Sequence, residues 1–420
     1  MQIQAQFTRS AKNNVVNNLC KSLLDNYIFE DTAVTMKNSL QKNSKAGMYN
    51  TITNPQEFAQ KLTQDLRSVY NDVHLSVIYN PQQAKGLSDT TGKNTSQTHE
   101  LNLEEARIQN FGFKKAEIIS GNIGYVYFDR FYPVTEEAKE TIQSTFNFLK
   151  NTNALIIDVR NNGGGDPEMV SYICSFLFTK PTHIDDLYER KTNKTQSLYT
   201  HAVKGSEFFV NKPIYVLTNR RTFSAAEGFA YDLQNQHRAQ IIGEITGGGA
   251  HLVSPQLISN GFIGLIPYAR AINPVTKTNW EAVGVKPDVD ALSDNATDAA
   301  MLIYYDYEIA NLKDSNKIKK IQWARTILDA KIHPYQIDTS ILKNYTGKFG
   351  DETFSYNAGA LYVHGKKSNP SRLIPLSQTT FKAIDIDYYK LEFIKSAAGQ
   401  VGGVVITYDD GYTRTDKKEE

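Results

Sequence analysis

Apolar residues in the first 70 positions recur at the three- and four-residue spacing of amphipathic helices. Two such stripes are Val16, Cys20, Leu23 and Tyr27, and further on Phe58, Leu62, Leu66 and Val69. Asn54 and Pro55 supply an N-cap and a first-turn residue for the second helix. The pattern predicts a small helical domain over residues 1–78, with the stripes as its core. A partner-binding groove is the alternative interpretation of the same stripes.

The periodicity stops after this region. Residues 80–105 are polar and rich in Gly, Ser, Thr and Asn, so we expect a linker or loop over residues 79–112. From residue 113 short apolar strands then alternate with helical patterns, which predicts an α/β (α+β) core over residues 113–333. The expected strands cover 123–131, 154–159, 214–218 and 239–244. One expected helix begins after Thr135, and two others cover 167–177 and 224–235.

The last 85 or so residues hold only short strand patterns, punctuated by Gly, Asn, Asp and Ser. Examples are ALYVHGK, RLIPLS, TFKAIDI, YYKLEFIK and GVVITYDD. They predict a small C-terminal antiparallel β domain over residues 334–420, with its boundary near Pro334.

Composition narrows the class of protein. The 420 residues include 46 Lys and Arg against 45 Asp and Glu, a net charge of +1, so the basic surplus of a nucleic-acid-binding protein is missing. Two cysteines, Cys20 and Cys174, cannot build a disulfide framework, and each lies in an apolar pattern that predicts a buried thiol. No apolar run approaches the ~18 residues of a membrane span. The N-terminal MQIQAQFT lacks signal-peptide features, as expected for a cytosolic protein or a mature fragment.

The segment DVRNNGGGDPEM, from Asp158 to Met169, joins a buried strand to a helix through Gly163, Gly164 and Gly165. Consecutive glycines allow backbone N–H groups to converge on an anion, which can be a bound phosphate or a transient oxyanion. A tight turn without a ligand explains the glycines equally well. The segment contains neither a Walker motif nor GxGxxG.

The segment IYVLTNRRTFSAAEGFA places Ser224 where a buried strand gives way to a helix. A serine there lies at the positive end of the helix dipole beside the N–H of Ala225, which suits a nucleophile with an oxyanion donor. The alternative is a plain N-cap, because Glu227 completes a capping box. A nucleophilic serine needs a base, and spacing alone does not choose between His74 and His251. Glu281 is a carboxylate that could orient an imidazole, or a simple surface charge.

Taken together, DVRNNGGG, TFSAAE, GEITGGGAH and EAVGVKPD resemble the tail-specific (C-terminal-processing) serine peptidase family. DLRSVYNDVHL and the stretch from Asn110 to Phe131 resemble the branch that contains interphotoreceptor retinoid-binding protein modules and the tricorn protease core. The resemblance covers roughly residues 56–290.

The resemblance implies a role for each matching position. Ser224 would be the nucleophile, His74 the general base and Glu281 its supporting carboxylate. The oxyanion hole would combine the amide of Ala225 with those of Gly163 or Gly164. His251 is the second candidate for the base.

One departure separates this chain from the processing-protease branch, which uses a Ser–Lys dyad. The lysine position is occupied here by Gly249, so Ser–His–Glu chemistry fits better. Too few residues separate His74 from Asn110 for a PDZ domain, and no metal or organic cofactor is implied. The resemblance therefore implies a peptidase of peptide or protein substrates, in the periplasm or outside the cell. The rival hypothesis is a non-catalytic protein that binds an apolar ligand or a peptide on the same scaffold.

Overall fold

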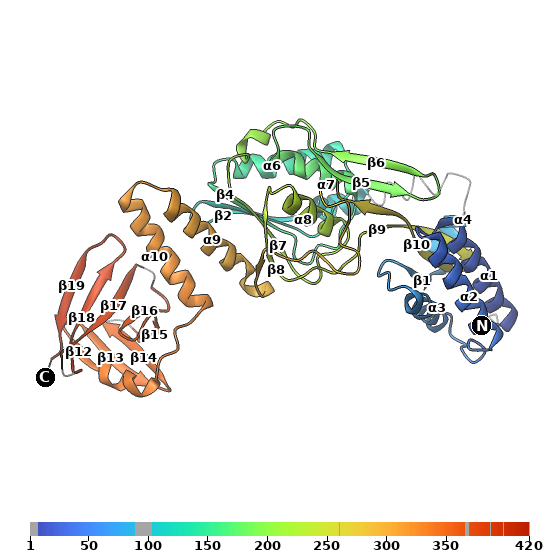
Figure 1. Cartoon of the computed structure of the whole chain (residues 1–420). Helices are drawn as coiled ribbons and strands as arrows, with labels where there is room; N and C mark the ends of the chain where they lie inside the picture. The colour runs from blue at the N-terminus through green and yellow to red at the C-terminus, as the bar shows by residue number, and fades with distance from the viewer. Residues whose placement is uncertain are drawn as a thin grey trace. The chain divides into compact units, whose positions relative to one another are not determined.

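The computed structural model describes residues 7–88, 103–259, 261–365, 369–386, 388–397 and 399–419. The chain divides into two compact units, Met1–Ala296 and Thr297–Glu420. The expected α/β core, the helical N-terminal region and the antiparallel C-terminal β domain are confirmed (Figure 1).

The N-terminal region consists of three helices and a short strand. These are α1 (Arg9–Asn26), α2 (Glu30–Lys45), α3 (Pro55–Val69) and β1 (Ser76–Tyr79). Asn54 caps α3 as expected, because its side chain accepts hydrogen bonds from the N–H groups of Gln56 and Glu57. The predicted stripes form one core with Phe262 and Ile266. Strand β1 pairs with β10 (Phe262–Ile272), so this helical region is joined to the core by a sheet.

The segment expected to be a loop is more ordered than its composition suggests. It contains α4 (Pro81–Ser88) and helical residues at 103–108. The prediction for residues 89–102 lies outside the described residues.

The core has a six-stranded sheet in the order β11-β8-β7-β4-β3-β2, in which only the edge strand β2 is antiparallel. Its strands are β2 (Phe113–Ile119), β3 (Ile123–Phe128), β4 (Ala154–Asp158), β7 (Ile214–Thr218), β8 (Gln240–Gly243) and β11 (Val289–Asp290). The helices α6 (Glu136–Leu149), α7 (Pro167–Cys174) and α8 (Ala225–Asn235) connect them. Every residue of β4 and β7 is buried, as expected for the centre of a parallel sheet.

A second, antiparallel sheet of the first unit has the order β1-β10-β5-β6, with β9 also paired to β10. Its remaining strands are β5 (His183–Glu189), β6 (Lys194–Tyr199) and β9 (His251–Ser259). Short 3-10 turns lie at Asn110–Gly112, Ser175–Leu177, Ser206–Phe208 and Ser293–Asn295.

The second unit contains α9 (Ala296–Asn311), α10 (Ser315–Ile332), a 3-10 helix (Thr339–Tyr345) and eight strands. Salt bridges of Lys331 with Asp298 and of Arg325 with Asp306 join the two α-helices. The division between the units thus lies earlier in the chain than the boundary expected near Pro334. The strands are β12 (Gly347–Phe349), β13 (Glu352–Asn357), β14 (Ala360–Gly365), β15 (Ser371–Pro375), β16 (Thr380–Ala383), β17 (Tyr389–Lys395), β18 (Val401–Tyr408) and β19 (Thr413–Lys417).

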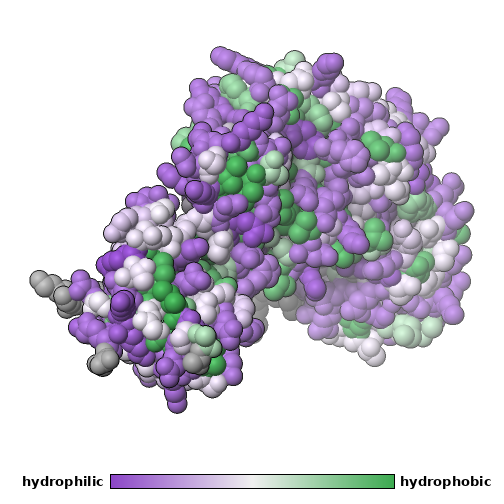
Figure 2. All heavy atoms as spheres, turned by 60° about the vertical axis from the view of Figure 1, so that its left-hand side comes forward, coloured by the Kyte–Doolittle hydropathy of each residue, from purple (hydrophilic) through white to green (hydrophobic). Residues whose placement is uncertain are grey.

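These eight strands follow one another in sequence order, and a bridge between Phe349 and Lys418 brings the first strand back to the chain just after the last. The result is a nearly closed barrel. Its interior is filled by packed side chains that include Phe349, Phe354 and Phe393. No helix among the described residues combines the length and apolar character needed to cross a bilayer. Polar residues dominate the face drawn in Figure 2, with apolar residues in small separate groups.

Candidate active site

Ser224 lies at the turn between β7 and α8, in a backbone conformation that residues other than glycine rarely adopt. Its φ is 56° and its ψ is −123°. A non-glycine residue at positive φ stores strain of about 1–3 kcal/mol and persists only where neighbours hold it. Here Phe223 N–H donates to Asn162 O at 2.9 Å, and Ser224 N–H donates to Glu227 Oε2 at 2.8 Å. The Ser224 side chain lines a pocket.

Glu227 is fully buried, and its carboxylate accepts four hydrogen bonds. Besides Ser224 N–H, it accepts Thr246 Oγ1–H at 2.5 Å, Gly248 N–H at 2.6 Å and Gly249 N–H at 2.8 Å. Burial raises the pKa of this carboxyl, while the four donors favour its charged form. Glu227 therefore joins the serine turn to the glycine-rich loop before β9. The sequence indicated only the local half of this network, through the capping box.

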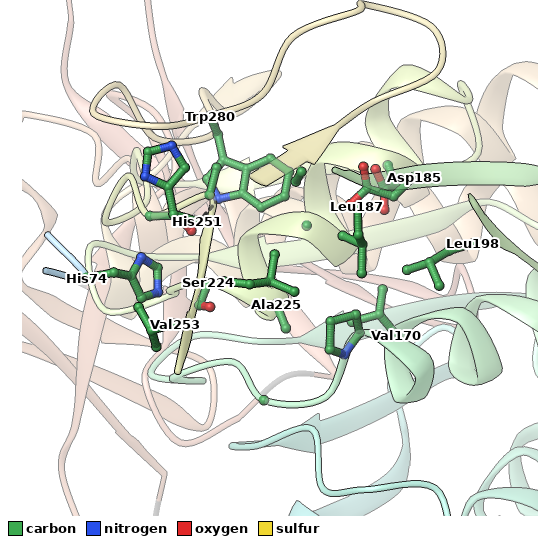
Figure 3. Close-up of a pocket in the computed structure, with 18 of the residues that line it drawn as sticks. His74, Val170, Asp185, Leu187, Leu198, Ser224, Ala225, His251, Val253 and Trp280 are labelled. Atoms are coloured by element: carbon green, nitrogen blue, oxygen red, sulfur yellow. Dashed lines mark hydrogen bonds between the residues drawn. The ribbon is translucent and has the colours of Figure 1, made fainter. Parts of the chain in front are cut away.

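His74 lies across the same pocket from a different part of the chain (Figure 3). Its ring stacks on Phe223 with centroids 4.6 Å apart, which places it beside the residue that precedes Ser224. Its backbone N–H donates to Asp72 Oδ1 at 3.0 Å, fixing the loop that carries it. Nδ1 is buried and has no partner among the described residues. Burial lowers the pKa of His74 to about 4, so the ring is neutral at pH 7.

The lack of a side chain at Gly249 leaves room for the His74 imidazole beside Phe223. A Cβ built on Gly249 would lie 2.5 Å from His74 Cε1 and 2.5 Å from Phe223 Cζ. The His74 ring thus fills the space that a side chain at position 249 would need.

Glu281 does not support His74, contrary to the expectation. Its Oε2 accepts Ala250 N–H at 2.6 Å and lies 3.6 Å from His251 Nδ1. Burial raises the pKa of Glu281 to about 7. The reason is tertiary: the segment that carries Glu281 runs beside the start of β9, where His251 lies.

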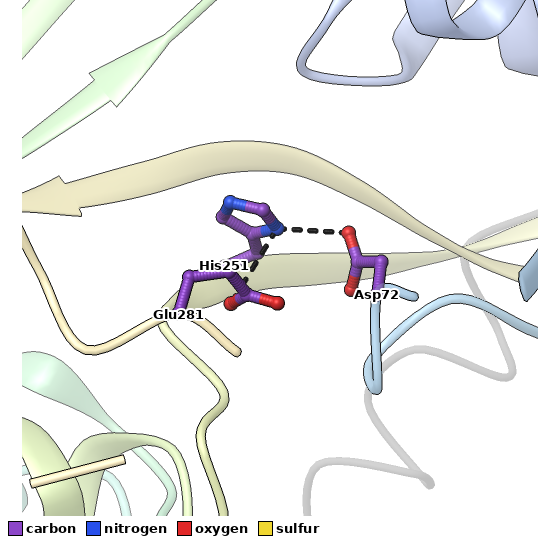
Figure 4. Close-up of side chains that lie close together, drawn as sticks. All are labelled: Asp72, His251 and Glu281. Atoms are coloured by element: carbon purple, nitrogen blue, oxygen red, sulfur yellow. Dashed lines mark hydrogen bonds and ion pairs between the residues drawn. The ribbon is translucent and has the colours of Figure 1, made fainter. Parts of the chain in front are cut away.

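His251 instead takes part in a buried cluster with two carboxylates (Figure 4). Its Nδ1 lies 2.8 Å from Asp72 Oδ2, which also accepts the Tyr27 hydroxyl at 3.0 Å. Although burial alone would raise it, the hydrogen bonds from His251 and Tyr27 lower the pKa of Asp72. Asp72, His251 and Glu281 offer three possible metal ligands within 4.8 Å of one another. Two of these atoms, Asp72 Oδ2 and His251 Nδ1, already form a hydrogen bond with each other, so the arrangement fits a hydrogen-bonded carboxylate–imidazole pair.

The glycines after β4 surround the serine turn, but their amides are not equivalent. Gly163 N–H donates to Asp129 O at 3.3 Å, and Gly164 N–H donates to Asn162 Oδ1 at 2.9 Å. The expected oxyanion role of these two amides is therefore corrected, because each already has an acceptor. Gly165 N–H and Ala225 N–H donate to no described residue, and both residues line the pocket. Gly164 still lies against the turn, since a Cβ there would be 2.8 Å from Ala225 N.

The pocket has a volume of about 260 Å³. Besides Ser224, Ala225, Gly165, His74 and His251, its walls include Val170, Leu187, Leu198, Trp280, Asp185 and Asp232. A strained serine, a neutral histidine and two free amides at one cavity are the groups that acyl transfer requires.

Comparison with known proteins finds a family match for two regions of the chain. Residues 122–291 match the model of peptidase family S41, and residues 5–111 match the N-terminal domain of that family in eukaryotic IRBP. The chain is 30% identical to the chloroplastic carboxyl-terminal-processing peptidase 2 of Arabidopsis thaliana over 176 residues, 40% of this chain and 32% of the relative. It is 33% identical to the tail-specific protease of Haemophilus influenzae over 136 residues, 31% of this chain and 18% of that protein. The chain thus matches about a third or less of these relatives' own lengths.

A crystal structure of a proposed peptidase from Parabacteroides merdae has a similar fold, with a TM-score of 0.50 and 19% identity. The match covers 70% of this chain and 96% of that one.

Proposed function

Because the chain belongs to peptidase family S41 and carries the N-terminal domain of the IRBP type, we propose that it is a serine peptidase that hydrolyses peptide bonds of peptide or protein substrates. The observation that carries the proposal is Ser224, held at positive φ at the start of α8 with its hydroxyl in a pocket. A plain N-cap requires neither the positive φ nor a position in a pocket wall.

In the proposed mechanism Ser224 Oγ attacks the peptide carbonyl, and His74 Nε2 takes the serine proton. A base has to be neutral before it acts, and burial keeps His74 neutral at pH 7. The contact between Gly249 and His74 supports this assignment. The processing-protease branch that the chain resembles has its lysine at the position of Gly249, and here the imidazole takes up that space.

The oxyanion of the tetrahedral intermediate would bind to the amides of Ala225 and Gly165. Loss of one such donor typically costs about 100- to 1,000-fold in rate. Asp72 positions His74 through its backbone N–H, so the carboxylate acts on the loop and leaves Nδ1 of the ring free. His251 stays the second candidate for the base, because its bond to Asp72 reproduces the His–carboxylate pair of a triad.

The test is labelling with a fluorophosphonate probe, which reacts with activated serines. We expect the wild-type protein to be labelled, and we expect Ser224→Ala and His74→Ala to lose labelling while His251→Ala keeps it. Loss in His251→Ala with retention in His74→Ala would transfer the base role to His251. Absence of labelling in folded wild-type protein would refute the peptidase and favour the binding protein. A periplasmic or extracellular location is part of the proposal and rests on the family resemblance alone.

A further inference from the structure

Two buried acidic residues at the candidate active site have no role in the mechanism above. Asp185 on β5 and Asp232 on α8 line the same pocket as Ser224. They are 6% and 1% exposed, although acidic side chains are rarely buried unless paired.

Their partners do not include a cation. Asp232 Oδ1 accepts the side-chain N–H of Asn273 at 2.9 Å, and Asp185 Oδ1 accepts Asp186 N–H at 2.9 Å. Asp185 also accepts a hydrogen bond from the backbone of Ile272. No lysine, arginine or histidine of the described residues forms a salt bridge with either carboxylate. Burial raises the pKa of both carboxyls, and the charge of Asp185 raises that of Asp232 further. Two negative charges are therefore disfavoured at this site, and a cation beside the carboxylates would favour their ionised forms.

The distance from the serine suits a long side chain. Ser224, Gly228 and Asp232 all line the pocket and are spaced four residues apart, so one face of α8 runs along it. Eight residues of helix correspond to about 12 Å. Gly228 adds no side chain to this face, and a Cβ there would come within 3.1 Å of Trp280.

The walls between the serine and the acids are apolar. Val170, Leu187 and Leu198 line this part of the pocket, and Figure 3 shows Leu187 between Ser224 and Asp185. A methylene stem fits such walls, and a cationic head fits the carboxylates at their end.

We propose that Asp185 and Asp232 form the anionic end of the subsite for the residue that supplies the scissile carbonyl, and that this residue is lysine or arginine. The inference rests on the proposed function, because it takes Ser224 as the nucleophile. A bound ammonium or guanidinium group allows both carboxylates to be ionised, whereas an apolar side chain of equal length leaves them unpaired.

The experiment compares internally quenched peptides that differ only at the residue before the scissile bond, which is Lys, Arg, norleucine or Gln. Norleucine keeps most of the lysine stem and lacks its charge. We expect wild-type protein to cleave the Lys and Arg peptides preferentially, with the cut after that residue verified by mass spectrometry. In Asp232→Asn and Asp185→Asn the ratio of kcat/KM for Lys over norleucine should fall by at least about 30-fold, the lower bound for removing one member of a buried charge pair. Asp186→Asn is the matched control, because Asp186 is next in sequence, is bonded to His183 and does not line the pocket.

A second measurement does not depend on turnover. We expect benzamidine to bind Ser224→Ala protein saturably in isothermal titration calorimetry, and binding to be lost when Asp232→Asn is added. Cleavage with norleucine equal to or better than Lys would overturn the inference and leave the peptidase intact. If no peptide is cleaved, the proposed function fails. Benzamidine binding that depends on Asp232 would then still support a cation subsite, and the absence of such binding would overturn the inference.

Discussion

Replacing Glu227 by glutamine tests the network that holds the serine turn. Two donors bind each carboxylate oxygen: Thr246 Oγ1 and Gly248 N at Oε1, and Ser224 N and Gly249 N at Oε2. An amide NH₂ can accept none of them. In the less costly orientation the NH₂ replaces Oε1, because the Thr246 hydroxyl can rotate to accept from it. Gly248 N–H is then left buried without a partner.

One unpaired buried amide costs about 1–3 kcal/mol. The substitution also removes a buried charge, which is favourable, and it weakens the two hydrogen bonds that remain at Oε2, which is unfavourable. These two effects on the free energy of unfolding offset each other, so the unpaired amide determines the net change. At about 2–4 °C per kcal/mol for a large domain, the expected fall in Tm is about 2–12 °C. The rate of fluorophosphonate labelling should fall too, because the loosened loop at Gly248 and Gly249 packs against His74.

Differential scanning calorimetry measures the first effect, and Glu57→Gln is the matched control. Glu57 is also the third residue of its helix but is exposed, so its change should stay within about 0.5 kcal/mol. If Glu227→Gln melts within about 1 °C of the wild-type protein, the four hydrogen bonds do not anchor the serine turn.

Three further predictions use the same labelling assay. Gly165→Ala should abolish labelling, because its Cβ would lie 1.9 Å from Phe131 O. Gly163→Ala should be labelled normally, because its Cβ would meet no atom within 4 Å, and loss of labelling would contradict this steric argument. Gly249→Ala should lose labelling with little change in circular dichroism, since the added methyl displaces the His74 ring; full labelling would exclude His74 as the base. The labelling rate should change little from pH 8 to pH 5, because a base with a pKa of about 4 is still mostly neutral at pH 5; an unperturbed histidine would lose about 30-fold over this range.

The local elements of this protein were predictable from sequence because their signals lie within a few residues. Asn54 and Pro55 begin α3 as expected, and the stripe from Val16 to Leu23 forms the buried face of α1. The same holds for Ser224 before α8, since strand-to-helix turns and capping residues depend on neighbours in the chain. Asp185 was missed because HIDDLYE contains adjacent acids, and nothing local shows that one of them faces a pocket.

By itself the sequence determined the class of fold, the order of its elements and the motifs that resemble a peptidase family. These depend on hydrophobic period, turn residues and short spacings, all of which are encoded locally. Only the tertiary structure decided how the chemical groups combine. Glu281 lies beside His251 and not beside His74. The amides of Gly163 and Gly164 already donate to acceptors, whereas that of Gly165 does not. Asp185 and Asp232 line one cavity. Burial and hydrogen-bond pairing between segments far apart in sequence determine which groups are free to react, and no local pattern carries that information.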